Sequence, residues 1–384
     1  MASDRPTGNL LRVAPEQPVD GDDPIRAVLA AFTRGLVSAV DRTLADFLAT
    51  EVAALTEIDT AMGAFAATAR DCVLAGGKRV RPTFAYWGWH GAVRGNAPVT
   101  PVLPALATLE LLHTFALVQD DVMDASDTRR GRPTAHVAMA AQHAAAGRNG
   151  DSGRFGEAVA VLIGDLCMVW ADQLLARADL PADRLLDVRR GYDRMRVETV
   201  AGQYLDVLSE TDPESWSVDR ALRVARYKTA SYTVQRPLLF GASLAGVGDD
   251  SRLVTAYTRY GLAVGEAFQL CDDLLGVYGD PTTTGKPAGD DLRTGKPTAL
   301  LMLARELATP AQLRVLDRAD RLAAVPDFTQ VAEVMADTGA VGRIERMIDD
   351  RVEDALTALD TAGIDETARS ALAGLASAAT HRRA

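Results

Sequence analysis

The sequence predicts an all-α protein, and three observations support this prediction. Ala and Leu dominate the apolar residues, whereas aromatic residues make up only 5% of the chain, a balance that favours helices. Apolar residues recur every three or four positions along most segments, which is the pattern of amphipathic helices. No alternation of apolar and polar residues continues long enough to indicate a strand. We therefore expect a bundle of about ten or more helices.

The chain divides into a short tail and one long helical domain. Residues 1–24 are rich in Pro, Asp and Gly with little apolar periodicity, so we expect a disordered tail. Residues 25–384 are expected to form a single all-α domain. Its helices are expected, in chain order, over 25–55, before Gly76-Gly77, from Lys78 onwards, and over 105–124, 158–176, 185–208, 219–245, 257–277, 299–307, 310–323, 328–338 and 340–362.

Glycine and proline mark the connections between these helices. Loops or turns are expected where these residues cluster, over 96–104, 143–156, 209–213 and 279–297. The last of these is long and charged for a plain connection, which is typical of functional loops. Pro237 lies inside an expected helix and predicts a kink there.

Charge and composition exclude several classes of function. The net charge of −11 argues against binding to nucleic acid or an anionic membrane. An anionic substrate would therefore need a local basic site or a bound metal. Three widely spaced cysteines match no disulfide framework and no zinc site, and we expect reduced thiols in a cytoplasmic protein. We find no signal-peptide pattern and expect no transmembrane segment.

Three carboxylates lie within five residues of the otherwise apolar segment Leu112–Asp124. Asp120 and Asp124 are one helical turn apart and share a face of the helix. Oxygen ligands at this spacing suit Mg²⁺, which binds one or two carboxylates and bridges to substrate phosphates. Arg129 and Arg130 follow closely and could bind those phosphates. An isolated cluster of this kind would fit a solvated acidic helix end equally well, so the other motifs decide.

A basic segment, Gly76–Pro82, is expected to bind anions. Two glycines precede Lys78, Arg79 and Arg81 at the start of a helix, where the helix dipole also favours negative charge. By itself such a segment would fit an exposed basic turn. His113 lies two helical turns before Asp120 on nearly the same face, and could reach the same site.

A second pair of carboxylates, Asp272 and Asp273, also occurs on an apolar helix, with Gln269 about one turn earlier. A second cluster of this kind is improbable on a helix whose acidic residues only face solvent. Two such helices facing one cavity could hold several Mg²⁺ ions around a diphosphate.

Two further basic features could complete an anion site. Lys286 and Lys296 lie in the Gly-rich loop that follows the second acidic helix, as residues of a closing lid would. Such a loop is also compatible with an ordinary mobile connection. Lys228 is a lone cation in an apolar helix, where its amine could instead extend to the surface.

Taken together, these motifs resemble those of the short-chain trans-isoprenyl diphosphate synthases, the polyprenyl synthetases, and most of all the actinobacterial geranylgeranyl diphosphate synthases. The likeness runs from Gly76 to Thr298 through GGKRVRP, His113 seven residues before DDVMD, RRGRP, YKTA, FQLCDDLLG and GDDLRTGKPT. It implies an isoprenoid-synthase-type helical bundle around a deep central cavity, and a homodimer. It also implies Mg²⁺ as cofactor, with several ions in each active site.

The resemblance assigns roles to individual residues. Asp120, Asp124 and Asp272 are expected to bind metal, with Asp121 and Asp273 in support. The expected contacts to the allylic diphosphate are Arg129, Lys228, Thr229, Gln269, Lys286 and Lys296. The expected contacts to isopentenyl diphosphate are Lys78, Arg81, His113 and Arg130. Lys228 is also expected to take part in catalysis, and Gln203 and Asp206 to line the cavity.

One position departs from the family pattern. Many relatives have a third aspartate where this chain has Gly276. Asp280, one turn further on, could compensate for the missing carboxylate. We expect activity to survive, because Asp272 and Asp273 remain.

The implied reaction is head-to-tail prenyl transfer. Isopentenyl diphosphate condenses with dimethylallyl, geranyl or farnesyl diphosphate to give geranylgeranyl diphosphate and diphosphate. Ala116 lies one turn below Asp120, and Phe115 is next to it. By resemblance, an aromatic residue next to a small one favours geranylgeranyl diphosphate, the twenty-carbon product. The alternative is a farnesyl diphosphate synthase, with a fifteen-carbon product.

Two other readings fit the sequence less well. A class I terpene cyclase would need a second motif beginning Asn-Asp, whereas the three asparagines of this chain begin no such pattern. A non-catalytic partner subunit is expected to have lost an acidic cluster or the basic segment, and this chain retains all of them.

Overall fold

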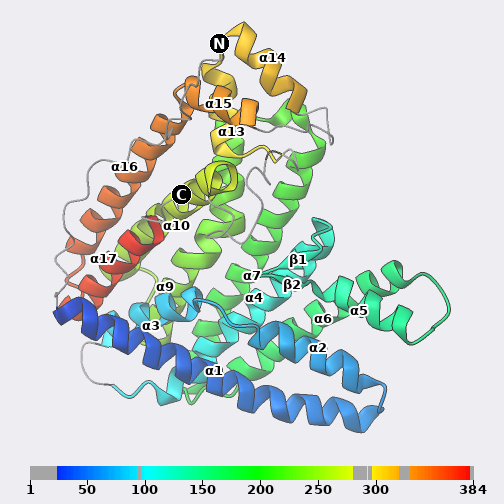
Figure 1. Ribbon diagram of the computed structural model, residues 1–384. Helices are drawn as coiled ribbons and strands as arrows, with labels where there is room; N and C mark the ends of the chain where they lie inside the picture. The colour runs from blue at the N-terminus through cyan, green and yellow to red at the C-terminus, as the bar shows by residue number, and fades with distance from the viewer. Residues whose placement is uncertain (1–23, 94–96, 280–291, 293–295, 320–328, 381–384) are drawn as a thin grey trace.

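The computed structural model describes residues 24–93, 97–279, 292, 296–319 and 329–380, and confirms the all-α prediction (Figure 1). The amino-terminal elements are α1 (Pro24–Ile58), α2 (Met62–Leu74), α3 (Val80–Val93), the 3₁₀ turn η1 (Thr100–Val102), α4 (Leu103–Met123), strands β1 (Thr128–Arg129) and β2 (Arg132–Pro133), α5 (Ala135–Ala145) and α6 (Ser152–Leu175). The elements that follow are α7 (Ala182–Thr211), the 3₁₀ turn η2 (Pro213–Ser215), α8 (Val218–Val224), the π-helical segment η3 (Ala225–Gln235), α9 (Arg236–Leu244), α10 (Arg252–Tyr278), α13 (Ala299–Leu307), α14 (Pro310–Ala319), α15 (Thr329–Asp337), α16 (Ala340–Asp360) and α17 (Glu366–Thr380).

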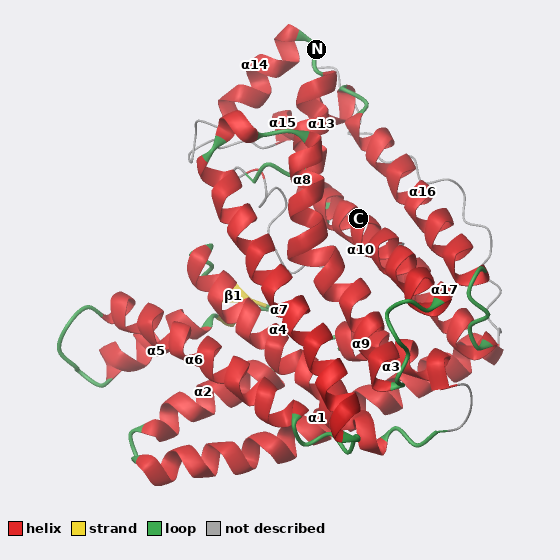
Figure 2. Ribbon diagram, turned by 180° about the vertical axis from the view of Figure 1, so that it is seen from behind, coloured by secondary structure: helices red, strands yellow, loops and turns green. Residues whose placement is uncertain are grey.

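The helices surround α4, which is apolar along most of its length. Leu106, Leu109, Leu111 and Leu112 of this helix are fully buried. Helix α1 crosses one end of the molecule, and α13, α14 and α15 gather at the opposite end (Figures 1 and 2). The apolar sequence of α4 therefore places the helix in the core, with the Asp120 motif at its carboxyl-terminal end.

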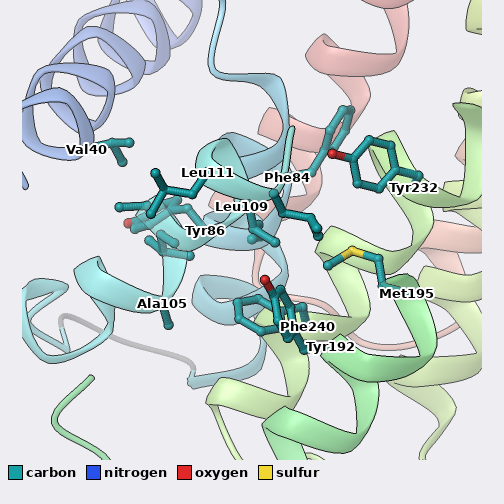
Figure 3. Close-up of a cluster of buried hydrophobic side chains, with 14 of the residues drawn as sticks. Val40, Phe84, Tyr86, Ala105, Leu109, Leu111, Tyr192, Met195, Tyr232 and Phe240 are labelled. Atoms are coloured by element: carbon teal, nitrogen blue, oxygen red, sulfur yellow. The ribbon is translucent and has the colours of Figure 1, made fainter. Parts of the chain in front are cut away.

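The described core has two clusters of buried side chains. The larger includes Leu109 of α4, Met195 of α7, Tyr232 of η3 and Phe240 of α9, which lie close together in Figure 3. The smaller joins α10 to α13, α14, α15 and α16. Because α10 contributes to both clusters, the helix carrying the second acidic motif is fixed from two sides.

Small residues allow α3 and α9 to cross at close range. A Cβ at Gly88 would lie 2.3 Å from the carbonyl oxygen of Leu238, and one at Gly241 would lie 2.0 Å from that of Ala85. Both positions are buried, so only glycine permits this separation of the backbones. The crossing fixes α3, whose first turn follows the basic segment.

Two helices are long and apolar enough to cross a membrane by length and composition, which the sequence prediction did not anticipate. They span Thr100–Met123 and Ser152–Leu175. The most apolar 18-residue stretch is 67% buried inside the protein in the first helix and 50% buried in the second. Buried core helices meet the same criterion. Because α4 packs in the core and α6 packs against it, this finding is weak support for a membrane segment.

Several helix boundaries differ from the predictions. The expected helix over 219–245 is divided into α8, the π-helical η3 and α9, and Pro237 lies in the first turn of α9, directly after the π-helical segment. Proline lacks an amide donor, and it lies where the hydrogen bonding changes from π-helical to α-helical. The kink expected at Pro237 stays a prediction. The loop expected over 143–156 is shorter, since Asp151 caps α6 by accepting from the amide of Arg154 at 2.7 Å. Helices α5 and α17 were not predicted.

Candidate active site

A cavity of about 870 Å³ lies between α4, α7, η3 and α10. Carboxylates line one side, from Asp120 of α4, Asp206 of α7 and Asp272 of α10, and the basic segment lines another. Most predicted site residues share this lining, namely Lys78, Arg81, His113, Ala116, Asp120, Arg129, Arg130, Lys228, Thr229, Gln269, Asp272 and Lys296. The fold therefore brings together residues that are distant in the sequence.

The first acidic motif ends α4 and divides its carboxylates between two environments. Asp120 faces the cavity, where its Oδ1 accepts from the side-chain amide of Gln203 at 3.0 Å. Asp121 is buried and accepts from Nε of Arg129 at 2.6 Å, so it orients that arginine. Asp124 caps the helix, does not line the cavity itself, and accepts from Lys296 Nζ at 3.0 Å. Of these three carboxylates, only that of Asp120 lines the cavity.

Lys228 joins the carboxylates of α4 and α7. Its Nζ lies 3.1 Å from Oδ1 of Asp120 and 2.5 Å from Oδ2 of Asp206. Burial lowers the pKa of Lys228, but the two carboxylates outweigh burial and raise it above its ordinary value. Burial likewise raises the pKa of Asp120, and Lys228 with its neighbours lowers it below its usual range. The pair is therefore ionised at neutral pH.

The second acidic motif brings both of its carboxylates to the cavity. Asp272, Asp273 and Gln269 all line it. Asp273 is buried, accepts from Nε2 of Gln269 at 2.9 Å, and accepts from the backbone amide of Ala299 at 3.2 Å. Asp273 thus orients Gln269 and receives the first amide of α13. Gly276 lines the same cavity, and Asp280 and Lys286 lie outside the described residues.

The basic segment has an unusual backbone. Gly76 and Gly77 have φ of 84° and 142°, and Arg79, which is not a glycine, has φ of 46°. Such angles favour glycine and turn the chain sharply between α2 and α3. The turn leaves Lys78 exposed and Arg79 buried, so consecutive cations point to different surroundings.

Arg81 and His113 form the innermost basic part of the cavity. Arg81 donates to Oγ1 of Thr233 at 2.9 Å, and its guanidinium lies 4.2 Å from the ring centroid of Tyr232. Burial, and then Arg81 and Arg130, lower the pKa of His113 well below its ordinary value. His113 is therefore neutral at neutral pH. Its buried Nδ1 has no hydrogen-bond partner among the described residues, which leaves it available to a ligand.

A short hairpin directs the two adjacent arginines to different parts of the site. Strands β1 and β2 pair Arg129 with Arg132. Arg130 and Gly131 have φ of 54° and 72°, the positive angles of a type I′ turn. Arg129 is held on the acidic motif by Asp121, whereas Arg130 donates to the carbonyl oxygen of Gly76 in the basic segment.

The two residues proposed to set product length have different positions. Ala116 lines the cavity, one helical turn below Asp120. Phe115 is 9% exposed and belongs to the larger core cluster, and it is absent from the cavity lining. Thr199 of α7 also lines the cavity.

Sequence reasoning missed several residues of the lining. Tyr232 lies four residues after Lys228, and Thr199 four residues before Gln203, so helical spacing could have indicated both. Glu110 also lines the cavity and lies three residues before His113, so the same kind of spacing could have indicated it. Trp216 lines the cavity without such a signal, because its contribution depends on packing between distant segments.

Comparison with known proteins identifies the family. The polyprenyl synthetase family model matches residues 64–336. The geranylgeranyl diphosphate synthase of Mycobacterium tuberculosis is 33% identical over 290 residues, which cover 74% of this chain and 75% of the relative. The geranylfarnesyl diphosphate synthase of Aeropyrum pernix is 32% identical over 295 residues, which cover 74% of this chain and 84% of the relative. These two names specify different product lengths.

A solved structure supports the same assignment. The geranylgeranyl pyrophosphate synthase of Corynebacterium glutamicum, complexed with isoprenyl diphosphate and magnesium, is 39% identical with a TM-score of 0.85. The match covers 91% of this chain and 99% of that chain. Enzymes of this family use isopentenyl and allylic diphosphates as substrates. The chain belongs to the polyprenyl synthetase family and is a short-chain prenyl diphosphate synthase.

Proposed function

We propose that this protein is a Mg²⁺-dependent geranylgeranyl diphosphate synthase. The observation that supports the chemistry is the convergence of two acidic motifs and one basic segment on a single cavity. The observation that supports the product is Ala116, a small side chain in the apolar lining below Asp120.

The acidic side of the cavity suits a hydrated divalent cation. Asp120 and Asp272 offer hard oxygen ligands, and Asp124 lies one turn from Asp120. Among the described residues, no group of three or more His, Cys, Asp or Glu side chains is placed to hold a metal ion by itself. Mg²⁺ commonly uses one or two carboxylates and completes its coordination with phosphate oxygens and water. When bound, it would neutralise charge on the diphosphate leaving group.

The lysines and Arg129 would bind the allylic diphosphate on this side. Lys228 and Lys296 are held by Asp120 and Asp124, within reach of the same cavity. As the carbon–oxygen bond breaks, its electron pair leaves with the diphosphate, and fixed cations stabilise the developing negative charge. The apolar lining near Ala116 and Leu117 excludes water from the allylic cation.

Isopentenyl diphosphate would bind on the basic side. Lys78, Arg81 and Arg130 supply the positive charge, and His113 supplies a neutral imidazole. The π electrons of its double bond form the new carbon–carbon bond to the allylic cation. A proton then passes to the released diphosphate and restores an alkene. Each cycle adds five carbons.

A farnesyl diphosphate synthase is the alternative. Phe115, directly beside Ala116, is bulky, and a shift of its side chain into the cavity would shorten the product. Incubation of the purified chain with isopentenyl diphosphate, Mg²⁺ and each allylic diphosphate, followed by product sizing, tests both. A twenty-carbon product from farnesyl diphosphate supports the proposal. Products that end at fifteen carbons contradict it, and the absence of elongation would exclude prenyl transfer.

We further propose a cytoplasmic homodimer formed through α6 and α7. Val197, Val200 and Tyr204 of α7 are 69%, 56% and 63% exposed and form a stripe at helical spacing. Leu162 and Val169 of α6 are 55% and 53% exposed. Apolar surface of this kind marks an interaction face. A second copy is the occupant that the resemblance implies.

A further inference from the structure

Arg79 is a buried cation in the lining of the cavity, and the proposed chemistry assigns it no contact with either substrate. Its side chain is 4% exposed, while its neighbour Lys78 in the same basic segment is exposed. Removing a charge from water is costly unless the charge is paired. The position of Arg79 therefore needs a physical explanation.

Every donor nitrogen of the Arg79 side chain is engaged by the protein. Nε donates to Asp41 of α1 at 2.8 Å, Nη1 donates to Glu110 of α4 at 2.7 Å, and Nη2 donates to the carbonyl oxygen of Val73 in α2 at 3.2 Å. Glu110 is itself only 5% exposed, and Asp41 is 44% exposed. Arg79 thus connects three helices to the basic segment, and each of its three side-chain nitrogens donates to a group of the protein.

The backbone of Arg79 is held as firmly as its side chain. Its φ of 46° lies in the left-handed region, which disfavours residues other than glycine. Its carbonyl oxygen accepts from Oγ1 of Thr83 at 2.8 Å and from the amide of Thr83 at 3.1 Å, at the start of α3. An unfavourable backbone angle persists only where surrounding contacts determine it, and the three side-chain contacts of Arg79 supply that constraint.

The held conformation decides where the neighbouring cations point. Lys78 precedes Arg79 directly, and Arg81 follows two residues later, where it contacts Thr233 and Tyr232 inside the cavity. On the other side of the segment, a Cβ at Gly77 would lie 3.0 Å from Nη1 of Arg130. The basic segment is therefore fixed between Arg130 and the buried contacts of Arg79.

We propose that Arg79 is a positioning residue that holds Lys78 and Arg81 in place for the diphosphate of isopentenyl diphosphate and does not touch the substrate. This inference rests on the proposed function, because that function assigns isopentenyl diphosphate to the basic side. It predicts a selective effect. Loss of Arg79 weakens binding of isopentenyl diphosphate and leaves binding of the allylic substrate nearly unchanged.

The first test is Arg79→Met. We expect its KM for isopentenyl diphosphate to rise by about tenfold or more, because small misplacements of binding groups have large effects. We expect the KM for the allylic diphosphate to stay within about twofold. Hydrogen exchange without substrate should become faster at the amides of residues 76–81, because the contacts that hold this segment are lost.

A second variant separates positioning from stability. Arg79→Met alone leaves Glu110 buried without its cation, which destabilises the fold. The double variant Arg79→Met/Glu110→Leu replaces the buried pair with apolar side chains and is expected to regain thermal stability. Its KM for isopentenyl diphosphate should remain high, because the segment is still not anchored. Recovery of this KM together with stability would overturn the inference.

Arg351→Met is the matched control. Arg351 of α16 donates to the buried carboxylate of Glu266 at 2.7 Å, and Glu266 keeps Arg226 as a second partner, so the loss of Arg351 removes one of two cations from a buried carboxylate. It should lower stability and leave both KM values unchanged. An equal rise in the KM for isopentenyl diphosphate in this control would contradict the inference.

Direct titration distinguishes the two possible failures. If the wild-type chain does not bind isopentenyl diphosphate by calorimetry, the proposed function is wrong. If the wild type binds and the folded Arg79→Met variant binds equally well, the proposed function stands and the role of Arg79 is wrong.

Discussion

Lys296 and Asp124 are 172 residues apart in the chain, yet Nζ of Lys296 lies 3.0 Å from Oδ2 of Asp124. Burial lowers the pKa of Lys296, but Asp124 and the neighbouring carboxylates outweigh burial and raise it above its ordinary value. A permanent cation is thus placed at the first acidic motif.

We expect Lys296→Met to lower kcat/KM for the allylic diphosphate by roughly 100-fold, because one fixed cation would be lost where leaving-group charge develops. Steady-state kinetics with each substrate varied in turn will measure this. Arg305→Met is the control, since Arg305 pairs with Asp317 on α13 and α14, outside the cavity lining. Equal losses in both variants would contradict the assignment.

Product length is predicted to depend on the side chain at position 116. Ala116→Phe would fill the apolar lining one turn below Asp120 and should shorten the product to fifteen carbons or fewer. Ala116→Val should have an intermediate effect, which separates steric shortening from general damage. Chromatography of the products measures the chain length made by each variant. An unchanged product from an active Ala116→Phe enzyme would show that the chain grows elsewhere.

Stability should depend on pH through His113. Burial holds its folded-state pKa well below the ordinary value of 6.5, so the unfolded chain binds more protons as the pH falls. The contribution of the neutral side chain is therefore complete above about pH 6.5 and is lost as the pH decreases below it. His113→Gln should make the melting temperature less dependent on pH between about pH 5 and 7. His90, which burial also shifts downward but which is partly exposed, should have a smaller effect.

The close crossing of α3 and α9 predicts a large effect from one methyl group. Gly88→Ala would place a Cβ 2.3 Å from a backbone oxygen, and overpacking of this kind typically costs about 1–3 kcal/mol. Gly191→Ala is the control, because no atom lies within 4 Å of its Cβ position on exposed α7. That change should stabilise by roughly 0.5–1 kcal/mol. Denaturant unfolding measures both free energies.

The proposed dimer predicts that Val200→Lys disrupts assembly. The charge would lie in the middle of the exposed α7 stripe, where burial against a second copy would be unfavourable. Light scattering should report a monomer for this variant and a dimer for the wild type. Leu356→Lys places the same charge on α16, at a residue 39% exposed, and should leave the mass unchanged. A wild-type monomer would refute the proposal.

Much of the fold and of the candidate site could be predicted, because residue types that suit a ligand occur in short motifs on segments with helical periodicity. Asp120, Lys78 and Asp272 each belong to a local motif whose residue types indicate a ligand, and helical periodicity indicates the elements that carry them. The π-helical turn at 225–235 could not be predicted, because it depends on packing against α7 and α10. The same holds for Arg79 and Glu110, which are 31 residues apart and meet only after folding. The expected tail at 1–24 remains a prediction.

The hairpin between α4 and α5 has a further consequence. Its two-residue turn, Arg130-Gly131, directly follows Arg129. Arg129 is held by Asp121, whereas Arg130 donates to the carbonyl oxygen of Gly76. In the proposed function these two consecutive residues bind different substrates, and the peptide unit between them keeps their spacing constant. Inserting one residue into this turn would change the distance between the allylic cation and the double bond of isopentenyl diphosphate, although every charged side chain would remain. In the proposed function, the geometry of carbon–carbon bond formation therefore depends partly on the backbone of the six-residue hairpin 128–133.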